Sequence, residues 1–319
     1  GTVQKNLLKL TRDERILYLT TGHGEASPRE KDNLLRKVNI FKKLVQSQNY
    51  KVKNLGVADG LATEVPDDAS VVIVAGPEEP FSPEEIAALS RYLDRGGALM
   101  LLIDPGAEKV QPLLDKLGIT AGDHPLAHET KFIPQKRGKV DRGLLVTNRF
   151  GSHASVRTLS KASTQLALVV PTVLPLEKVD GAPGKRTTVI RTFPDTWPDA
   201  NGNYEKDADE KGKVYDIDIA ITGPEDSASP YRALVLGDVS VLADNVVGFS
   251  KGNQQFILDS TRWLVKDDEI EGTIENEEDV KIQHNRDEDA ISFYLSILGI
   301  PIGVLGIGFV VIRIRRRKA

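Results

Sequence analysis

Apolar runs alternate with helix-forming segments through residues 16–120, and this alternation restricts the fold more than any other feature. Buried strands are expected at RILYLTTG, ASVVIVAGP and ALMLLIDPG, and an alternating, half-exposed strand at YKVKNLGV. Continuous apolar strands separated by helices indicate a mostly parallel sheet that is covered on both faces. The sequence therefore predicts an open, doubly wound α/β sheet.

Start and stop signals place the helices between these strands. The first helix is expected from Ser27 to about Ser47, because Ser27-Pro28 forms an N-cap and first-turn pair. The second, FSPEEIAALSRYLDRGG, has the same start signal and two glycines at its end. A third is expected at AEKVQPLLDKLGI, and a short amphipathic helix, Gln4–Arg12, precedes the first strand.

The pattern loosens after residue 121, where strands are expected at GLLVTNRF, LALVVPTVLPLEKV, KRTTVIRTF and KVYDIDIAITG. Residues 194–213 are rich in Pro, Asp, Asn and Gly, which indicates a loop or lid. A buried strand ending at Gly237-Asp238 and an amphipathic helix, GNQQFILDSTRWLVK, then close the domain. We therefore divide the soluble part into an α/β core, residues 1–120, and its continuation with a β-rich insert, residues 121–265. An acidic stalk, residues 266–290, follows, and an edge hairpin is the alternative for this segment.

The segment Ile291–Ile312 contains no charged residue and is long enough to cross a bilayer core of about 30 Å. Its internal Pro301 is tolerated in a membrane-spanning helix. Acidic residues precede this segment, and the basic tail of residues 313–319 follows it. The positive-inside rule then predicts a transmembrane helix with a cytoplasmic C-terminus and an extracytoplasmic domain. The alternative is a buried core helix. The basic side chains of the tail are Arg313, Arg315, Arg316, Arg317 and Lys318.

Charge and composition exclude several classes of partner and site. The chain carries 42 basic and 46 acidic residues, and five of the basic ones belong to the tail, so the remainder is acidic. An acidic domain argues against nucleic acid as the partner. The absence of cysteine excludes disulfides, Cys-ligated zinc, iron–sulfur clusters and a cysteine nucleophile. Because no export signal or apolar anchor stands at Gly1, we expect one upstream of it.

Several segments in fixed order resemble the GldG-like auxiliary components of gliding-motility-associated ABC transporters. They are LYLTTGHGE, VVIVAGPEEPFSPEEIAALSRYLDRGGALMLLIDPG, RTFPDTW, LVLGDVSVLADN with GNQQFILDSTRWLV, and the C-terminal span. The resemblance implies a periplasmic domain similar to class I glutamine amidotransferases and flavodoxin-like folds. It also implies a place in the bacterial cytoplasmic membrane, beside its lipid and the ATPase and permease of a transporter, and no established catalysis.

Polar turns follow three of the expected strands, and ligands of doubly wound sheets bind at such strand ends. If the strands are neighbours, His23, Glu25, Asp104 and Asp238 line one acidic cleft. In the alternative interpretation, each carboxylate caps a helix or ties a turn. Trp197, in the polar segment PDTWPDANGN, is open to two interpretations as well. It either stacks on a sugar or grips a partner, or it plugs its loop onto the core.

Motifs for catalysis, metals and phosphate are missing from the sequence. No Gly-x-Ser-x-Gly elbow and no Walker loop is present, so neither a serine hydrolase nor an ATPase is expected. His23 and Glu25 supply only two ligands, and Pro125 argues against a helix that would pair His124 with His128. We predict no metal and no cofactor. The expected function is that of a non-catalytic, membrane-anchored transporter subunit. The alternatives are a binding module for cell-wall glycan or peptide and a cryptic hydrolase at His23 and Glu25.

Overall fold

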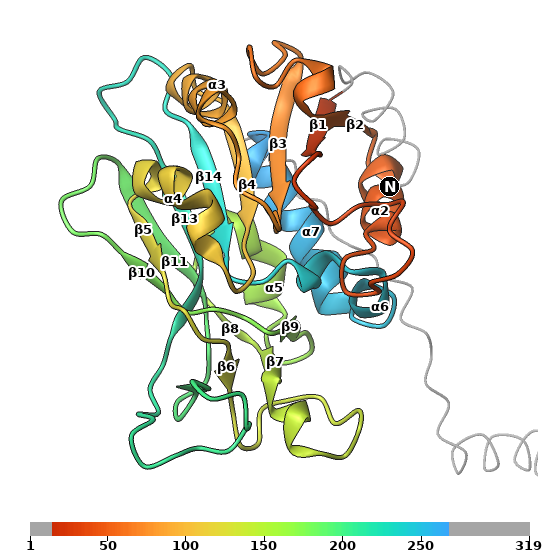
Figure 1. Ribbon diagram of the computed structural model, residues 1–319, viewed down its shortest axis with the longest axis vertical. Helices are drawn as coiled ribbons and strands as arrows, with labels where there is room; N and C mark the ends of the chain where they lie inside the picture. The colour runs from red at the N-terminus through yellow and green to blue at the C-terminus, as the bar shows by residue number, and fades with distance from the viewer. Residues whose placement is uncertain (1–14, 268–319) are drawn as a thin grey trace, which may run out of the picture. The chain divides into compact units, whose positions relative to one another are not determined.

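A ten-stranded sheet forms the centre of residues 15–267, the part of the chain that the computed structural model describes (Figure 1). Its parallel half has the order β2-β1-β3-β4-β14. The strands of this half are β1 (Arg15–Thr20), β2 (Tyr50–Leu55), β3 (Ala69–Ala75), β4 (Ala98–Leu102) and β14 (Arg232–Leu236). The order 2-1-3-4 is that of flavodoxin-type doubly wound sheets. The prediction of an α/β fold with a mostly parallel central sheet is therefore confirmed.

Antiparallel strands extend the sheet beyond β14. β13 pairs with β14 on one side and with β10 and β11 on the other, while β5 pairs with β10 and β8 with β11. Four of these five strands lie after residue 121, where the sequence pattern loosens, and β5 lies just before that region. The bounds are β5 (Ile119–Ala121), β8 (Arg149–Phe150), β10 (Leu176–Lys178), β11 (Lys185–Arg191) and β13 (Asp216–Thr222).

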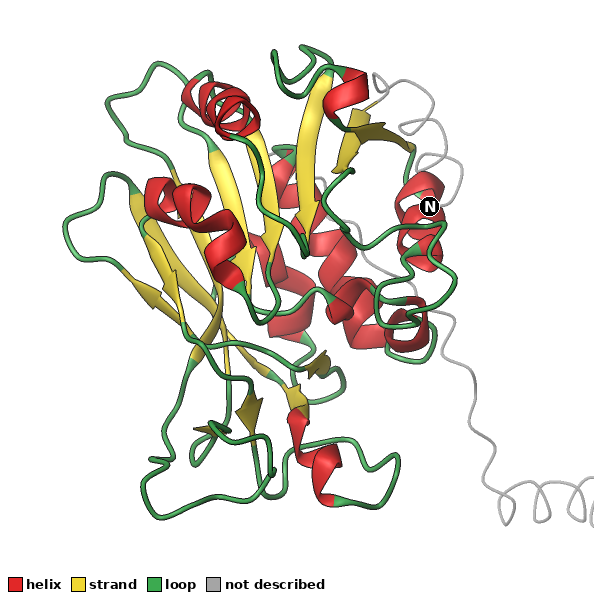
Figure 2. Ribbon diagram, viewed as in Figure 1, coloured by secondary structure: helices red, strands yellow, loops and turns green. Residues whose placement is uncertain are grey.

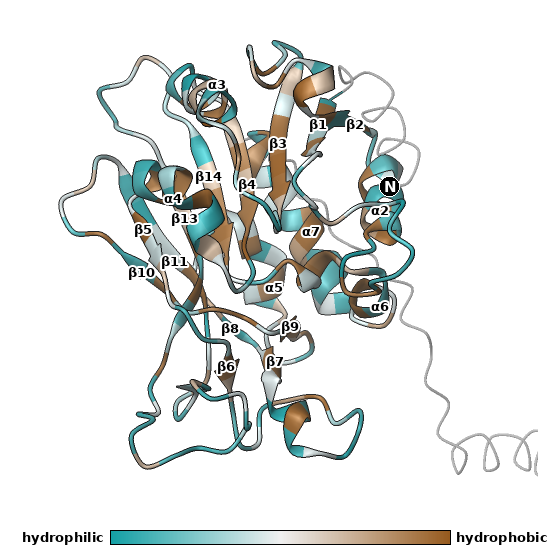
Figure 3. Cartoon of the chain, in the orientation of Figure 1, coloured by the Kyte–Doolittle hydropathy of each residue, from teal (hydrophilic) through white to brown (hydrophobic). Residues whose placement is uncertain are grey.

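Helices cover both faces of the sheet (Figure 2). α3 (Pro83–Asp94) and α4 (Gln111–Leu117) pack on one face, where Leu89, Leu93 and Leu113 join one apolar cluster. α2 (Asn39–Ser47), α5 (Arg157–Lys161) and α7 (Lys251–Leu264) pack on the other. Alternate residues of each central strand face the two clusters, which is why these strands are apolar along most of their length (Figure 3).

Short elements complete the described chain. Two small sheets pair β6 (Leu126–Ala127) with β12 (Trp197–Pro198), and β7 (Leu144–Thr147) with β9 (Leu168–Pro171). A one-turn helix, α6 (Asp244–Val247), adjoins α2. Turns of 3-10 helix lie at Val57–Asp59, Ala107–Val110, Lys139–Gly143, Ala154–Val156 and Ser240–Leu242.

One predicted helix is wrong over half of its length. The helix expected from Ser27 begins only at Asn39, and residues 27–38 form a loop. Side chains explain the difference, because they bond the backbone in a non-helical form. The carboxylate of Glu30 accepts the N–H groups of residues 31–33, and the amide oxygen of Asn33 accepts that of Leu35. By contrast, α3 begins and ends where the sequence places it, with Ser82 as its N-cap.

Several predicted segments lie outside the described residues. They are the helix Gln4–Arg12, nearly all of the stalk, the segment Ile291–Ile312 with its Pro301, and the tail with Arg315, Arg316 and Arg317. Within residues 15–267, none of the helices combines the length and the apolar character needed to cross a membrane. The membrane anchor therefore stays a prediction.

Candidate functional site

The candidate site is the edge of the sheet where the parallel strands end. β1 lies between β2 and β3. After β1 the chain continues to β2 on one side of it, and then crosses to β3 on the other side. Crevices at such switch points bind ligands in other doubly wound proteins. Four loops meet this edge, and they follow β1, β3, β4 and β14. They carry all the strand-end residues that the sequence singled out.

The Arg36 side chain fills the switch point. Its guanidinium Nη2 donates to the carbonyl oxygen of Gly24 at 2.7 Å and to that of Gly76. Its Nη1 lies 2.8 Å from Asp104 Oδ2, and its Nε lies 3.2 Å from Glu78 Oε1. Arg36 is only 8% exposed. One buried cation thus joins the loops after β1, β3 and β4 and neutralises the carboxylate of Asp104.

Backbone hydrogen bonds close the same edge. The carbonyl oxygen of His23 accepts the N–H groups of Glu78 and Glu79 at 2.7 and 3.1 Å, and Ala26 donates to the carbonyl of Ala75 at 2.9 Å. Gly24 has a φ of 74°, and a Cβ there would lie 2.9 Å from the Glu78 side chain. Glycine is therefore required where the two loops touch. These contacts use the space in which other proteins of this fold hold a ligand.

His23 lies between two buried carboxylates. Its Nε2 is 3.1 Å from Glu85 Oε2, its Nδ1 is 3.5 Å from Glu25 Oε1, and its ring packs on Phe81. The carboxylates have structural partners too. Glu25 accepts the N–H of His23 at 2.8 Å, and Glu85 accepts the N–H of Ser82 as part of the α3 capping box. This cluster ties the β1 loop to the start of α3.

Asp104 and Asp238 end the adjacent strands β4 and β14, and both are tied to the backbone. Asp104 Oδ1 accepts the N–H of Val239 at 3.2 Å, and Asp238 Oδ1 accepts the N–H of Ser240 at 2.7 Å. Burial raises the pKa of the Asp104 carboxyl, against the opposing effect of Arg36. Burial also raises the pKa of the Asp238 carboxyl well above its usual value, and the charge of Asp104 adds to this effect.

The four predicted residues thus form two clusters. Asp104 and Asp238 lie together, and Arg36 links Asp104 to the β1 loop, whereas His23 and Glu25 associate with Glu85. Each carboxylate ties a turn or a helix start, which favours the interpretation of these residues as structural ties over that of an open acidic cleft. Sequence reasoning did not identify Arg36 or Glu85 as members of this edge.

Trp197 does not offer a stacking surface. Its side chain is fully buried in β12, which pairs with β6. The structure therefore corresponds to the interpretation in which this residue plugs its loop onto the core, and the proposed contact with a sugar or partner through Trp197 is wrong for this conformation.

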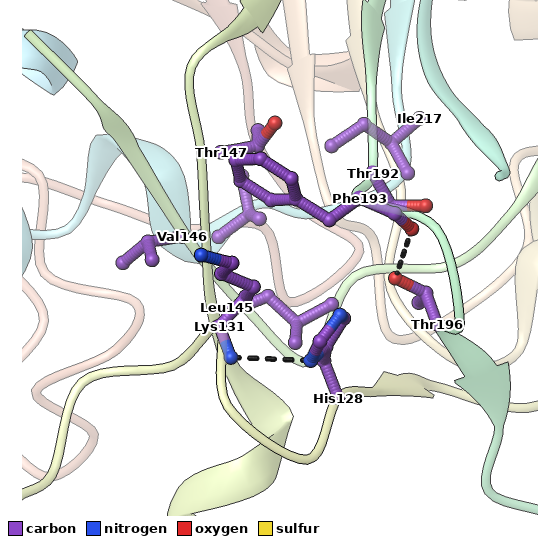
Figure 4. Close-up of a pocket in the computed structure, with 10 residues that line it drawn as sticks. His128, Lys131, Leu145, Val146, Thr147, Thr192, Phe193, Thr196 and Ile217 are labelled. Carbon is purple, nitrogen blue, oxygen red and sulfur yellow. Dashed lines mark hydrogen bonds between the residues drawn. The ribbon is translucent and has the colours of Figure 1, made fainter.

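A small depression lies among β7, β9 and the loop before β12 (Figure 4), and its side chains leave no room for a water molecule. It is therefore far smaller than ordinary ligand pockets, which start at ~300 Å³. Its one histidine, His128, is engaged on both sides. Nε2 lies 2.9 Å from the carbonyl oxygen of Pro194, and Nδ1 accepts the N–H groups of Thr130 and Lys131. These contacts require the neutral tautomer with its proton on Nε2.

Replacing His128 with alanine is expected to lower the free energy of unfolding by about 1 kcal/mol, because the part-buried backbone groups of Thr130, Lys131 and Pro194 lose their hydrogen-bond partner. Burial lowers the pKa of His128. The contribution of His128 to the free energy of unfolding is thus complete above its unfolded-state pKa near 6.5, and it is lost as the pH falls through the lower pKa of the folded state. Urea unfolding at pH 8 and pH 5 measures this. The wild type and His128→Ala should differ more at pH 8, and an equal difference at both pH values contradicts the assignment.

The part of the chain that forms most of this sheet edge matches a known protein family. Residues 14–129 match a family described as an ABC-type uncharacterized transport system. The match covers β1 to β6, including His23, Arg36 and Asp104. It confirms the resemblance to an ABC-transport auxiliary component, and it does not address gliding motility or membrane anchoring.

The chain is also similar to intraflagellar transport proteins. The intraflagellar transport protein 52 homologs of Homo sapiens and Mus musculus are 28% identical to it over 104 residues, or 30% of this chain. The aligned part is 23% of the human protein and 24% of the mouse protein, so less than a quarter of either is spanned. The solved mmIFT52 N-terminal domain covers 81% of this chain and 99% of its own, with a TM-score of 0.60 and 17% identity. This similarity shows a shared fold.

Proposed function

We propose that this chain is a non-catalytic subunit of an ABC transporter system. The observation that carries the proposal is the family match over residues 14–129, which includes the whole parallel half of the sheet except β14. The geometry of the sheet edge agrees with it. Arg36 and the loops after β1 and β3 use the crevice for their own contacts, and the nearby carboxylates are engaged as structural ties.

The finer features of the proposal rest on the sequence. A transmembrane helix at 291–312 would anchor the chain in the bacterial cytoplasmic membrane, with residues 1–290 outside and the basic tail inside. The expected partners are the permease and ATPase of a gliding-motility or export system. The name of the intraflagellar relatives also refers to transport.

A cell-wall binding module is a weaker candidate. It relied on Trp197 as an aromatic platform, and that side chain is buried. A hydrolase at His23 and Glu25 is disfavoured as well, because His23 is held between Glu25 and Glu85, and both carboxylates serve as structural ties.

Affinity purification of the tagged full chain from mildly solubilised membranes tests the proposal. The permease and ATPase of one transporter should co-purify with it and be identified by mass spectrometry. A variant that ends at residue 290 serves as a control for the anchor and should be recovered in the soluble fraction. Recovery of the wild-type chain without any transporter subunit would count against the proposal.

A further inference from the structure

A polar loop between β12 and β13 has the sequence DANGNYEKDADE and spans Asp199 to Glu210. Twelve-residue calcium loops follow the pattern D-x-[DN]-x-[DN]-G-x5-E, in which the side chains at positions 1, 3, 5, 9 and 12 supply oxygen ligands. Here every one of these positions carries a carboxylate or an amide. The five residues are Asp199, Asn201, Asn203, Asp207 and Glu210.

The loop departs from the pattern at position six, where Tyr204 replaces glycine. Calcium loops need glycine there for a sharp turn of the chain. Tyr204 has a φ of 57°, which is the left-handed conformation that glycine adopts most readily. The backbone therefore makes the turn in spite of the substitution.

The oxygen-bearing side chains turn into the loop. Asp207 Oδ2 lies 2.7 Å from the amide nitrogen of Asn201 and 3.0 Å from that of Asn203. Glu210 reaches back across the loop, where its two oxygens accept the N–H groups of Ala200 at 3.0 Å and Asp207 at 2.9 Å. Positions 3, 5, 9 and 12 are thus gathered within one turn of chain.

Asp199 supplies a separate indication of a missing ligand. It is only 4% exposed, and its Oδ1 is buried without a hydrogen-bond partner. Its Oδ2 accepts the N–H of Tyr204 from across the loop at 3.2 Å, so the carboxylate faces the loop interior. A buried carboxylate oxygen without a partner is costly unless a cation or a donor satisfies it.

The base of the loop is held in place, and in the described part of the chain the three carboxylates that would be ligands have no ion pair of their own. Trp197 and Pro198 pair with β6, Asp199 donates its N–H to the carbonyl of Pro125, and Lys213 bonds Thr196. Within residues 15–267, none of the carboxylates of Asp199, Asp207 and Glu210 forms an ion pair with a lysine or arginine. Two cations that do contact the loop bind other groups of it: Lys139 pairs with Glu205, and Arg142 donates to the backbone carbonyl of Tyr204.

We propose that the loop Asp199–Glu210 binds one Ca²⁺ ion through the side chains of Asp199, Asn201, Asn203, Asp207 and Glu210. Ca²⁺ takes six to eight oxygen ligands from flexible carboxylates, amides and carbonyls. Among the described residues, no three acidic or histidine side chains are placed to hold a metal, so the loop has to tighten and the two asparagine amides have to complete the carboxylate ligands when the ion binds. Binding requires the two asparagine amides to turn their oxygens inward. This site lies outside residues 14–129 and is independent of the proposed transporter role.

Calorimetric titration of the full chain with CaCl₂, after treatment with a chelator, tests the site. We expect one ion to bind with a Kd below about 1 mM, and MgCl₂ to bind more weakly because Mg²⁺ demands a near-octahedral set of ligands and gives up its water reluctantly. Glu210→Gln should weaken Ca²⁺ binding at least about tenfold, because it removes a charged ligand. Glu225→Gln, an exposed glutamate in another loop, should bind as the wild type does.

A second variant keeps the test independent of folding. Asp207 is half-buried at the rim of the loop, so Asp207→Asn should fold normally and still bind Ca²⁺ more weakly. Ca²⁺ should also raise the melting temperature of the wild type and not that of Glu210→Gln. The absence of both heat and a melting shift at about 10 mM Ca²⁺, ten times the expected Kd limit, overturns the proposal. Unchanged affinity in both Asp207→Asn and Glu210→Gln overturns it too.

Discussion

Replacing Arg36 with methionine is expected to lower the free energy of unfolding by about 3–5 kcal/mol. Methionine keeps much of the side-chain volume and removes the charge. The carboxylate of Asp104 then loses its cation in a buried site, and the carbonyls of Gly24 and Gly76 lose their donor. Glu78 should contribute little to this loss, because its side chain is 60% exposed and is well solvated without Arg36.

Chemical unfolding of Arg36→Met, Asp104→Asn and the double variant measures the effect. Because the two residues are partners, the double variant should be less destabilised than the sum of the single ones. Arg29→Met, an exposed arginine of the same loop, is the matched control and should stay within about 0.5 kcal/mol of the wild type. If Arg36→Met is as mild as this control, Arg36 does not hold the sheet edge together.

Asp218→Asn is expected to make the protein more stable at neutral pH and to leave it almost unchanged near pH 4. Asp218 lies in the centre of β13 with no exposed surface, and neither carboxyl oxygen has a hydrogen-bond partner. Burial raises the pKa of this carboxyl well above its usual value. The folded protein therefore holds a proton that the unfolded chain releases near pH 3.8.

The sign of the pH dependence follows from this difference. The contribution of protonated Asp218 to stability is complete below about pH 3.8 and is lost as the pH rises toward the folded pKa. The gain from Asp218→Asn should grow by up to about 1.4 kcal/mol per pH unit over that interval and then level off. Urea unfolding from pH 4 to pH 8 measures the gain, with the exposed Asp226→Asn as control. Parallel profiles of Asp218→Asn and the wild type would refute the assignment.

The sheet was predictable because its signals are local. Continuous apolar strands, and the Ser82-Pro83 start of α3, are visible in short windows of sequence, and the structure has them in those places. The failure at residues 27–38 has a local cause too. Glu30 and Asn33 bond the backbone in place of a helix, and these bonds outweigh the Ser27-Pro28 start signal that favoured one.

The contacts at the sheet edge were not predictable, because they join distant positions. Arg36 meets Gly76 and Asp104 across 40 and 68 residues, and no sequence window contains such a pair. His23, Glu25 and Asp104 were found because they follow strands, but their partners decide what they do. Trp197 had two open interpretations because its neighbour strand, β6, is only two residues long and has no pattern of its own.

We expect the switch point of this sheet to be closed by the chain's own groups in solution. Hydrogen–deuterium exchange of the full chain, followed in peptides covering residues 21–38 and 76–81, measures this closure. The amides of Ala26 and Glu78 bond across this edge, so they should exchange slowly, and nucleotides, flavin or sugars should not change the rates. Fast exchange in these peptides that a ligand then slows would contradict this expectation and would reveal an open binding crevice.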